Sequence, residues 1–264
     1  MIEKPNMMRD VLTVKNKFFV TPHYIRVILE SDQMDLFQEA NIGDNNKLVI
    51  PMDKTKPLQL PDGPPKGGVS DFYIRTYTLR AIDFEKSEMT VDFVMHGETG
   101  PASKWAINAQ PGDQLGVLMK AKRKPLFQEA DWYLLVGDHT ALPVISAILE
   151  QLPSNAQGQV VLEVPEPEDV LELEKPEHIQ IHWVFNPTPG ENSQLVSVMK
   201  EIPLDVYPNK FVYAAAEYHI VKEMQDLLRQ EQSLERKDWY AFSYWKYGVA
   251  EDGSAQDRRG LTKN

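Results

Sequence analysis

Cysteine is absent from the 264 residues of this sequence. The absence excludes disulfides, thiolate metal sites, iron–sulfur clusters and a cysteine nucleophile. The sequence also lacks the run of about 18 apolar residues that is needed to cross a bilayer. Residues 1–10 have no apolar core of the kind found in signal peptides. The last two absences predict a soluble, cytoplasmic protein that does not associate with membranes.

Basic charge is scarce, since 28 Lys and Arg face 39 Asp and Glu, for a formal net charge of −11. Residues 1–124 carry 17 basic and 16 acidic side chains, whereas residues 125–264 carry 11 and 23. Nucleic-acid binding is disfavoured, because it needs a positive surface. We expect an anionic ligand to approach the first half, where basic residues crowd into 120–124. The same crowding is typical of a solvated basic loop.

The usual constellations of catalytic and metal-binding residues are also missing. His178 and His182 share one face of a predicted strand, but the sequence specifies no acidic partner for a metal site. Ser146 and Ser243 lack the context of a nucleophile elbow. The dinucleotide fingerprint GxGxxG does not occur. We therefore predict no metal site and no catalytic acid, base or nucleophile.

Two elements of the first half together predict an FAD site. In a predicted strand, Arg75 and Tyr77 point to the same face. The arginine offers a planar cation for a phosphate and the tyrosine a flat ring for an isoalloxazine. About twenty residues further on, a glycine-rich turn (97–100) precedes a predicted helix over 103–109. The free N–H groups and positive dipole end of that helix suit a pyrophosphate.

The two halves of the sequence differ in pattern, which predicts an α+β protein of two domains. Residues 1–124 read as six short strands separated by loops rich in Pro and Gly, which predicts a small, closed, antiparallel six-stranded β-barrel that binds flavin. Residues 125–264 alternate strand and helix. This alternation predicts a mostly parallel sheet with helices on both faces, an α/β domain of the NAD(P)-binding type with a C-terminal tail.

Three segments of the second half are candidate ligand sites. Ligands of parallel sheets bind at the carboxyl ends of strands, which is where 137–143 and 214–217 are expected. Thr140 is the expected N-cap of the first helix. Both segments are equally consistent with a well-capped helix and a tightly packed turn. The segment 244–248 has three aromatic residues around one lysine, which suits either a flavin and an anion or ordinary packing in a core or interface.

In this order the segments resemble the ferredoxin-reductase superfamily and, more closely, the siderophore-interacting proteins, which are FAD-containing ferric-siderophore reductases. The resemblance covers almost the whole chain. It rests on the collinear segments 75–78, 91–97, 100–106, 111–113, 137–143 and 244–248.

This resemblance implies how the cofactors are held. The flavin would be held by Arg75, Tyr77 and Thr78, its ribityl or adenine end by Asp92, Val94 and His96, and its phosphates by the backbone of Gly100, Ala102 and Ser103. Thr140, Ala141 and Glu217 would lie at the nicotinamide-nucleotide site or the domain cleft, and Trp245 beside the flavin.

The resemblance also implies the reaction and its substrate. FAD would take electrons from NADH, NADPH or a reduced ferredoxin and pass them to the Fe(III) of a siderophore, which then releases Fe(II). Lys246, in the matching terminal motif, would hold the anionic siderophore, whereas Lys47, Lys122 and Arg123 are assigned to it from charge and position alone. Two alternatives stay open, namely a flavin-dependent reductase of another acceptor (a protein or free flavin) and a siderophore-binding iron carrier without turnover.

Overall fold

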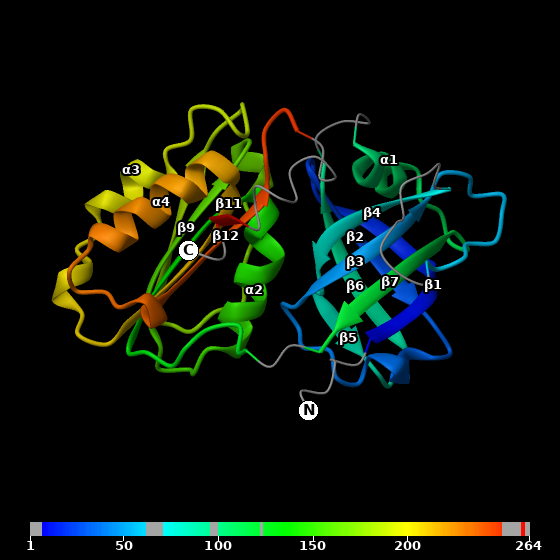
Figure 1. Cartoon of the computed structure of the whole chain (residues 1–264), viewed down its shortest axis with the longest axis horizontal. Coiled ribbons are helices and arrows are strands. Elements are labelled where there is room, and N and C mark those ends of the chain that lie inside the picture. The colour runs from blue at the N-terminus through cyan, green and yellow to red at the C-terminus, as the bar shows by residue number, and fades with distance from the viewer. Residues whose placement is uncertain (1–6, 62–70, 96–99, 122–123, 250–259, 262–264) are drawn as a thin grey trace. The chain divides into compact units, whose positions relative to one another are not determined.

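The computed structural model describes residues 7–61, 71–95, 100–121, 124–249 and 260–261. The chain divides into two compact units, Met1–Pro125 and Leu126–Asn264. Figure 1 shows that strands dominate the first unit, whereas the second unit mixes strands and helices. Within the described residues, no helix combines the length and the apolar character that a membrane span requires.

The first unit is built around one antiparallel sheet whose strands follow the order β4-β3-β7-β1-β2-β6-β5. It also contains the 3₁₀ helix η1 (Met34–Phe37) and the helix α1 (Pro101–Asn108). The strands are β1 (Met7–Thr21), β2 (Tyr24–Glu30), β3 (Asn45–Pro51), β4 (Phe72–Thr78), β5 (Ala81–Asp83), β6 (Glu88–Val94) and β7 (Gln114–Lys120).

The strand β5 is the one that the sequence did not predict. The strand that contains Arg75 and Tyr77 ends at Thr78, and β5 pairs with β6 across a hairpin in which Ser87 has a positive φ of 55°. Three residues are too few to show an alternating pattern, so β5 has no sequence signal of its own. The sheet therefore has seven strands where six were expected.

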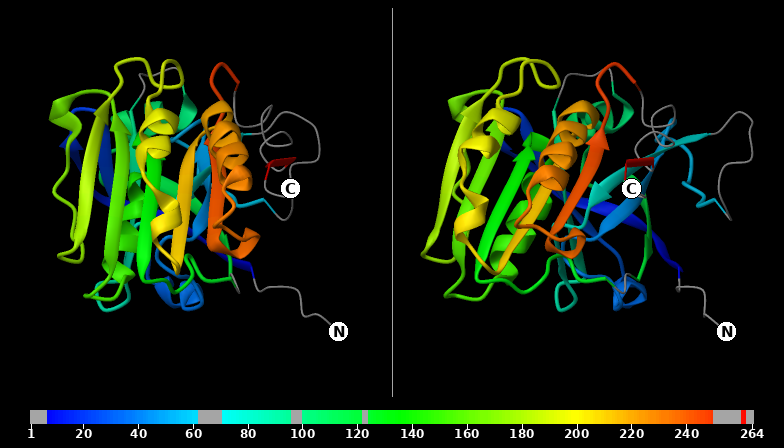
Figure 2. Two further views of the ribbon diagram at one scale, coloured as in Figure 1. Left: turned by 90° about the vertical axis from the view of Figure 1, so that its left-hand side faces the viewer. Right: turned by 60° about the vertical axis from the view of Figure 1, so that its left-hand side comes forward.

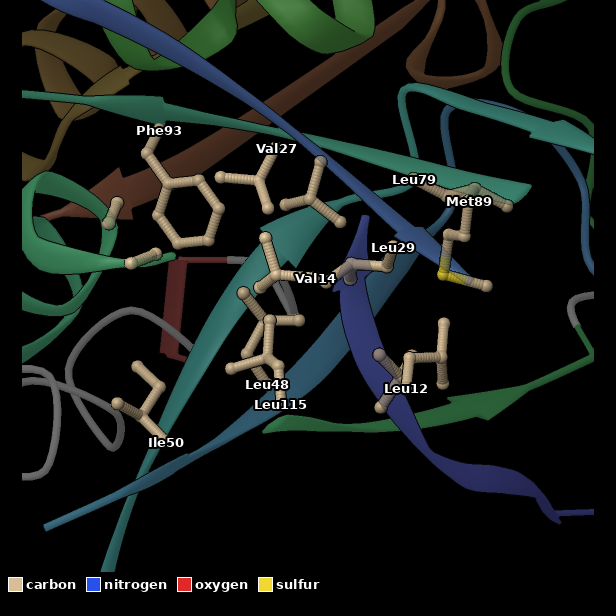
Figure 3. Packing of buried hydrophobic residues seen from close by; sticks show 14 of the residues in the cluster. Leu12, Val14, Val27, Leu29, Leu48, Ile50, Leu79, Met89, Phe93 and Leu115 are labelled. Atoms are coloured by element: carbon tan, nitrogen blue, oxygen red, sulfur yellow. The ribbon is translucent and has the colours of Figure 1, made fainter. Parts of the chain in front are cut away.

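The apolar core of the first unit lies inside the curl of this sheet. Leu12, Leu48 and Phe93 come from three different strands and are fully buried together (Figure 3). The curled sheet agrees with the predicted barrel, but hydrogen bonding does not close it. Among the described residues no ladder joins β4 to β5, which are the two edges of the sheet. The ring of Tyr77 on β4 contacts the ring of Phe93 on β6, with centroids 4.6 Å apart.

The second unit confirms the predicted parallel sheet. Its strands follow the order β10-β9-β8-β11-β12, and every pair is parallel. They are β8 (Trp132–Asp138), β9 (Gln157–Val164), β10 (Ile179–Phe185), β11 (Lys210–Glu217) and β12 (Trp239–Trp245). The helices are α2 (Leu142–Gln151), α3 (Leu195–Glu201) and α4 (Tyr218–Gln230), with 3₁₀ turns η2 (His139–Ala141), η3 (Pro167–Asp169), η4 (Leu204–Val206) and η5 (Arg236–Asp238).

Helices cover both faces of this sheet, with α3 and α4 on one side and α2 on the other (Figure 2). The central strands β8 and β11 are buried along their whole length, as expected for strands covered on both faces. Their carboxyl ends, Asp138 and Glu217, lie at the same edge of the sheet because the strands are parallel. This edge is the expected ligand-binding edge of an open α/β sheet.

Candidate functional site

The strand β4 presents a cation and an aromatic ring on one face. The register with β3 places Arg75 opposite Leu48 and Tyr77 opposite Asn46, so these side chains share a face of the sheet. The guanidinium of Arg75 lies 5.6 Å from the ring centre of Tyr73 and donates a hydrogen bond to the carbonyl of Ile74 at 2.7 Å. Arg75 and Tyr77 are thus adjacent on one face, as their spacing in the sequence predicts.

The helix α1 begins at a glycine, and no side-chain cap is found for it among the described residues. Its N-cap is Gly100, Pro101 follows in the first turn, and the first turn contains no acidic residue. Ala102 and Ser103, the next two residues, are buried. A helix start without a side-chain cap or a carboxylate keeps its positive dipole end available to an anion.

The opposite end of α1 is fixed by two lysines from distant parts of the sequence. The ammonium group of Lys17 donates to the carbonyls of Ala106, at 3.0 Å, and Ile107. Burial and the nearby ammonium group of Lys54 lower the pKa of Lys17. Lys54 itself donates to the carbonyl of Asn108 at 2.9 Å. Cations at this end complement the helix dipole, so the lysines stabilise the helix from the end away from its anion-binding start.

These groups fit FAD, which joins a flat ring system to a pyrophosphate. Arg75 and the start of α1 supply positive charge and N–H groups for phosphates, and Tyr77 supplies a ring for stacking. The indole of Trp105 on α1 packs against Phe93 with ring centres 5.7 Å apart. Its N–H is buried and has no hydrogen-bond partner in the described part of the chain. An unpaired buried donor of this kind is expected where a ligand binds.

Asp92, predicted to line the cofactor, has its carboxylate engaged within the first unit. It is 3% exposed, and its two oxygens accept bonds from the Arg26 guanidinium at 2.7 and 2.8 Å. The hydroxyl of Tyr24 donates to it at 3.1 Å. Burial, with the Asp92 carboxylate adding to it, raises the pKa of Tyr24 well above its usual value. The contacts of Asp92 therefore tie β6 to β2.

The remaining predicted residues of the first unit fall in different places. Thr78 is buried at the end of β4, and Val94 is half-buried at the end of β6. Lys47 lies opposite Thr76 and donates to its hydroxyl, on the face of the sheet away from Arg75 and Tyr77. His96, Lys122 and Arg123 lie outside the described residues.

Asp138 links three strands at the carboxyl edge of the second unit. One oxygen accepts bonds from the N–H and hydroxyl of Thr140, at 2.9 and 2.5 Å. The other accepts from the N–H of Glu217 at 2.9 Å and the indole N–H of Trp245 at 2.7 Å. Asp138 is the N-cap of η2, since its side chain accepts from the N–H of Thr140, and Ala141 is the N-cap of α2. The prediction that Thr140 is the N-cap of the helix was therefore wrong.

Burial raises the pKa of Asp138 to about 6. Its hydrogen bonds from Thr140 and Trp245 oppose this shift, and the carboxylate of Glu163 adds to it. Glu163 is itself buried and accepts bonds from the side chain of Asn186 and the N–H of Gln194, both at 3.1 Å. Neither acid was among the predicted site residues, although Asp138 lies within the segment 137–143. The sequence signal that could have identified both residues is an acidic residue at the carboxyl end of a buried strand.

Glu217 is the N-cap of α4 and is fully buried. One oxygen accepts bonds from the N–H groups of His219 and Ile220, and the other accepts from the N–H of Tyr247 at 3.0 Å. The carboxylate thus holds the start of a helix and the segment after β12. Its predicted role at the nicotinamide nucleotide stays a prediction.

The segment 244–248 is held at this same edge by two of these bonds. Trp245 donates to Asp138, and the backbone of Tyr247 donates to Glu217. Between them, the ammonium group of Lys246 lies 4.7 Å from the ring centre of Tyr218. Carboxylates of β8 and β11 therefore determine where this lysine projects from the backbone.

Replacing Gly137 with alanine is expected to destabilise the second unit by about 1–3 kcal/mol through overpacking. A Cβ atom at Gly137 would lie 2.5 Å from the Cβ atom of Ala141 and 3.0 Å from the carbonyl oxygen of Ala215. The measurement is chemical denaturation of both proteins. The control is Gly260→Ala, because a Cβ atom at Gly260 would meet open space. Gly112→Ala is unsuitable as a control, because Gly112 has a φ of 94°, which strains an alanine. Equal unfolding midpoints for wild type and Gly137→Ala would contradict the close approach.

The curled antiparallel sheet of the first unit and the parallel sheet of the second define a fold of the ferredoxin-reductase type. A ferredoxin NADP⁺ reductase of Neisseria gonorrhoeae with bound FAD and NADP shares the fold, with a TM-score of 0.62 at 12% identity over 89% of this chain and 98% of that one. The model of the siderophore-interacting FAD-binding domain matches residues 13–121, and that of the siderophore-interacting protein matches residues 130–248.

Two relatives are similar over nearly their whole length. Ferric vibriobactin reductase ViuB of Vibrio cholerae is 33% identical over 256 residues, which cover 94% of this chain and 93% of that protein. The crystal structure of the siderophore-interacting protein SipS from Aeromonas hydrophila has a TM-score of 0.83 at 31% identity, covering 97% and 99% of the two chains. The chain belongs to the siderophore-interacting protein family, and its cofactor is FAD.

Proposed function

We propose that this protein is a ferric-siderophore reductase that takes electrons from NAD(P)H or a reduced ferredoxin. The observation that carries the proposal is the pairing of Arg75 and Tyr77 with the uncapped start of α1, inside the family's FAD-binding domain. The relative from Vibrio cholerae is named a ferric vibriobactin reductase, which supports a ferric siderophore as substrate. FAD, when bound, supplies the redox chemistry.

In this proposal the chain's own residues bind and orient. Arg75 and the N–H groups of the first turn of α1 hold the phosphates of the cofactor, with Thr78 beside its ring system. Tyr77 carries the ring system on one side and rests on Phe93 on its other side, which fixes the orientation of the tyrosine. No proton transfer from a side chain is required to reduce Fe(III), which agrees with the absence of a catalytic acid or base among the predicted residues.

Substrate capture is assigned to the segment 244–248. A siderophore that carries negative charge is attracted to Lys246, and the cation–aromatic contact with Tyr218 keeps the side chain extended over that ring. The unit that carries Lys246 is otherwise acidic, with 11 basic and 23 acidic side chains in residues 125–264, so it repels the same ligand away from this lysine. Fe(II) then leaves because a siderophore holds it more weakly than Fe(III).

Lys246→Ala is expected to raise KM for an anionic ferric chelate by about two- to fivefold, the range for one partly exposed charge pair. KM for a neutral ferric chelate should not change. Steady-state kinetics with both chelates measures the difference. Lys222→Ala removes an exposed lysine from α4 and is the matched control. Equal losses for the two chelates would count against an electrostatic role.

The proposed reaction is tested by anaerobic reduction of the purified protein with NADH, NADPH and reduced ferredoxin in turn. Ferric siderophores are then added, and Fe(II) is trapped with a coloured chelator. Reoxidation of the flavin together with trapped Fe(II) supports the proposal and identifies the donor. A flavin that is reduced but not reoxidised by any ferric chelate would instead indicate another acceptor. A protein that binds no flavin would indicate a carrier without turnover.

A further inference from the structure

Asn46, on β3, is a polar side chain enclosed in an apolar environment. It is 1% exposed, and the next inward-facing residues of the same strand, Leu48 and Ile50, belong to the hydrophobic core. Neither the amide nitrogen nor the amide oxygen of Asn46 has a hydrogen-bond partner within the described residues. Few buried amides in native proteins leave both their donor and their acceptor unused.

Such an arrangement destabilises the protein by itself. A buried amide without partners loses its hydrogen bonds to water and gains none in return. A valine or leucine at this position would avoid the loss and would continue the apolar pattern of Leu48 and Ile50. The buried amide therefore indicates a hydrogen-bonding partner outside the described part of the polypeptide.

The position of Asn46 indicates which partner this is. The register of β3 and β4 places Asn46 directly opposite Tyr77, so the two side chains lie on the same face of the sheet. Tyr77 is half-buried and carries the ring on which the flavin stacks in the proposed function. Arg75, two residues away on β4, shares that face.

We propose that the Asn46 carboxamide hydrogen-bonds the polar edge of the flavin ring system stacked on Tyr77. The inference rests on the proposed function only in taking Tyr77 as the stacking residue. A flavin ring offers carbonyl acceptors on either side of an N–H donor, and a carboxamide offers an NH₂ donor beside a carbonyl acceptor. The two edges are complementary. Asn46 is then a binding residue, and hydrogen bonds to the ring are also among the means by which a protein tunes its electronics.

The test compares stability without the cofactor and affinity for the cofactor. Asn46→Leu, which keeps the branched shape of the side chain with somewhat more volume, is expected to raise the denaturation midpoint of the FAD-free protein, because the unpaired amide is gone. The same change is expected to weaken FAD binding by about fivefold or more, which corresponds to one lost hydrogen bond. Binding is measured by the quenching of flavin fluorescence, and the absorption spectrum of the bound flavin should shift.

Asn45→Leu is the matched control, since Asn45 is the exposed neighbour on the opposite face of β3. It should leave the FAD dissociation constant unchanged. If Asn46→Leu does not fold, Asn46→Ser removes the carboxamide without added bulk, and it should also bind FAD more weakly. Wild-type affinity and an unshifted spectrum in the Asn46 variants would overturn the proposal. These readouts involve no iron, so a failure of ferric reduction would leave them unaffected.

Discussion

Arg75→Ala is expected to weaken FAD binding by about 10- to 100-fold, the loss that follows from removing hydrogen bonds between a cation and a phosphate. Arg75 is the one cation that shares the inner face of β4 with Tyr77 among the described residues of that strand. Fluorescence titration of the FAD-free protein measures the change. Arg75→Lys keeps the charge but loses the planar fork, so its affinity should fall between those of wild type and Arg75→Ala.

The control for this experiment is Arg229→Ala, which removes an arginine from α4 in the other unit. Its FAD affinity should equal that of the wild type. If Arg75→Ala also kept the wild-type affinity, the phosphates would have to be held by other groups. The start of α1 would then carry the whole of the anion binding.

Asp138→Asn is expected to change how the stability of the protein depends on pH. Burial raises the folded-state pKa of Asp138 from 3.8 to about 6. A raised pKa means that this group's contribution to stability is complete below about pH 4 and is lost as the pH rises through about 6. Asparagine does not titrate in this range, so the variant shows no such loss of stability as the pH rises. The difference in unfolding free energy, variant minus wild type, should therefore rise between pH 4 and pH 7 by up to about 3 kcal/mol.

Urea denaturation at a series of pH values measures this difference. Its value at pH 4 gives the cost of an amide NH₂ group that faces the N–H of Glu217 and the indole N–H of Trp245. Asp205→Asn removes one exposed carboxylate from the same unit and is the matched control. A difference that fell with rising pH would show that the hydrogen bonds to the Asp138 anion outweigh its burial.

Sequence reasoning recovered the fold because its periodic signals are strong. The alternation of strand and helix over 125–264 predicted the parallel sheet, because long buried strands such as β11 have a clear apolar run. The alternation that exposes Arg75 and Tyr77 on one face is a local property of an extended segment, and the register with β3 agrees with it. The short strand β5 was not predicted, because three residues are too few to show a hydrophobic periodicity.

The hydrogen bonds of Asp138 at the carboxyl edge of the second unit could not be predicted from local sequence patterns. The bond between Asp138 and Trp245 joins residues 107 positions apart, and nothing local in either segment specifies the other. The unpaired amide of Asn46 is likewise visible only once β3 is known to face the core, because an asparagine near the start of a predicted strand suggests a turn. Both features depend on tertiary contacts and not on local pattern.

The contacts of Asp138 also bear on the order in which the second unit is assembled during synthesis. Asp138 ends the first strand of that unit, and the indole that completes its hydrogen bonding belongs to the last strand, β12. Domains fold as their residues leave the ribosome, from the N-terminal side onward. The hydrogen bonds of Asp138 at this edge of the sheet are therefore incomplete until Trp245 has left the ribosome, when nearly the whole unit has been translated.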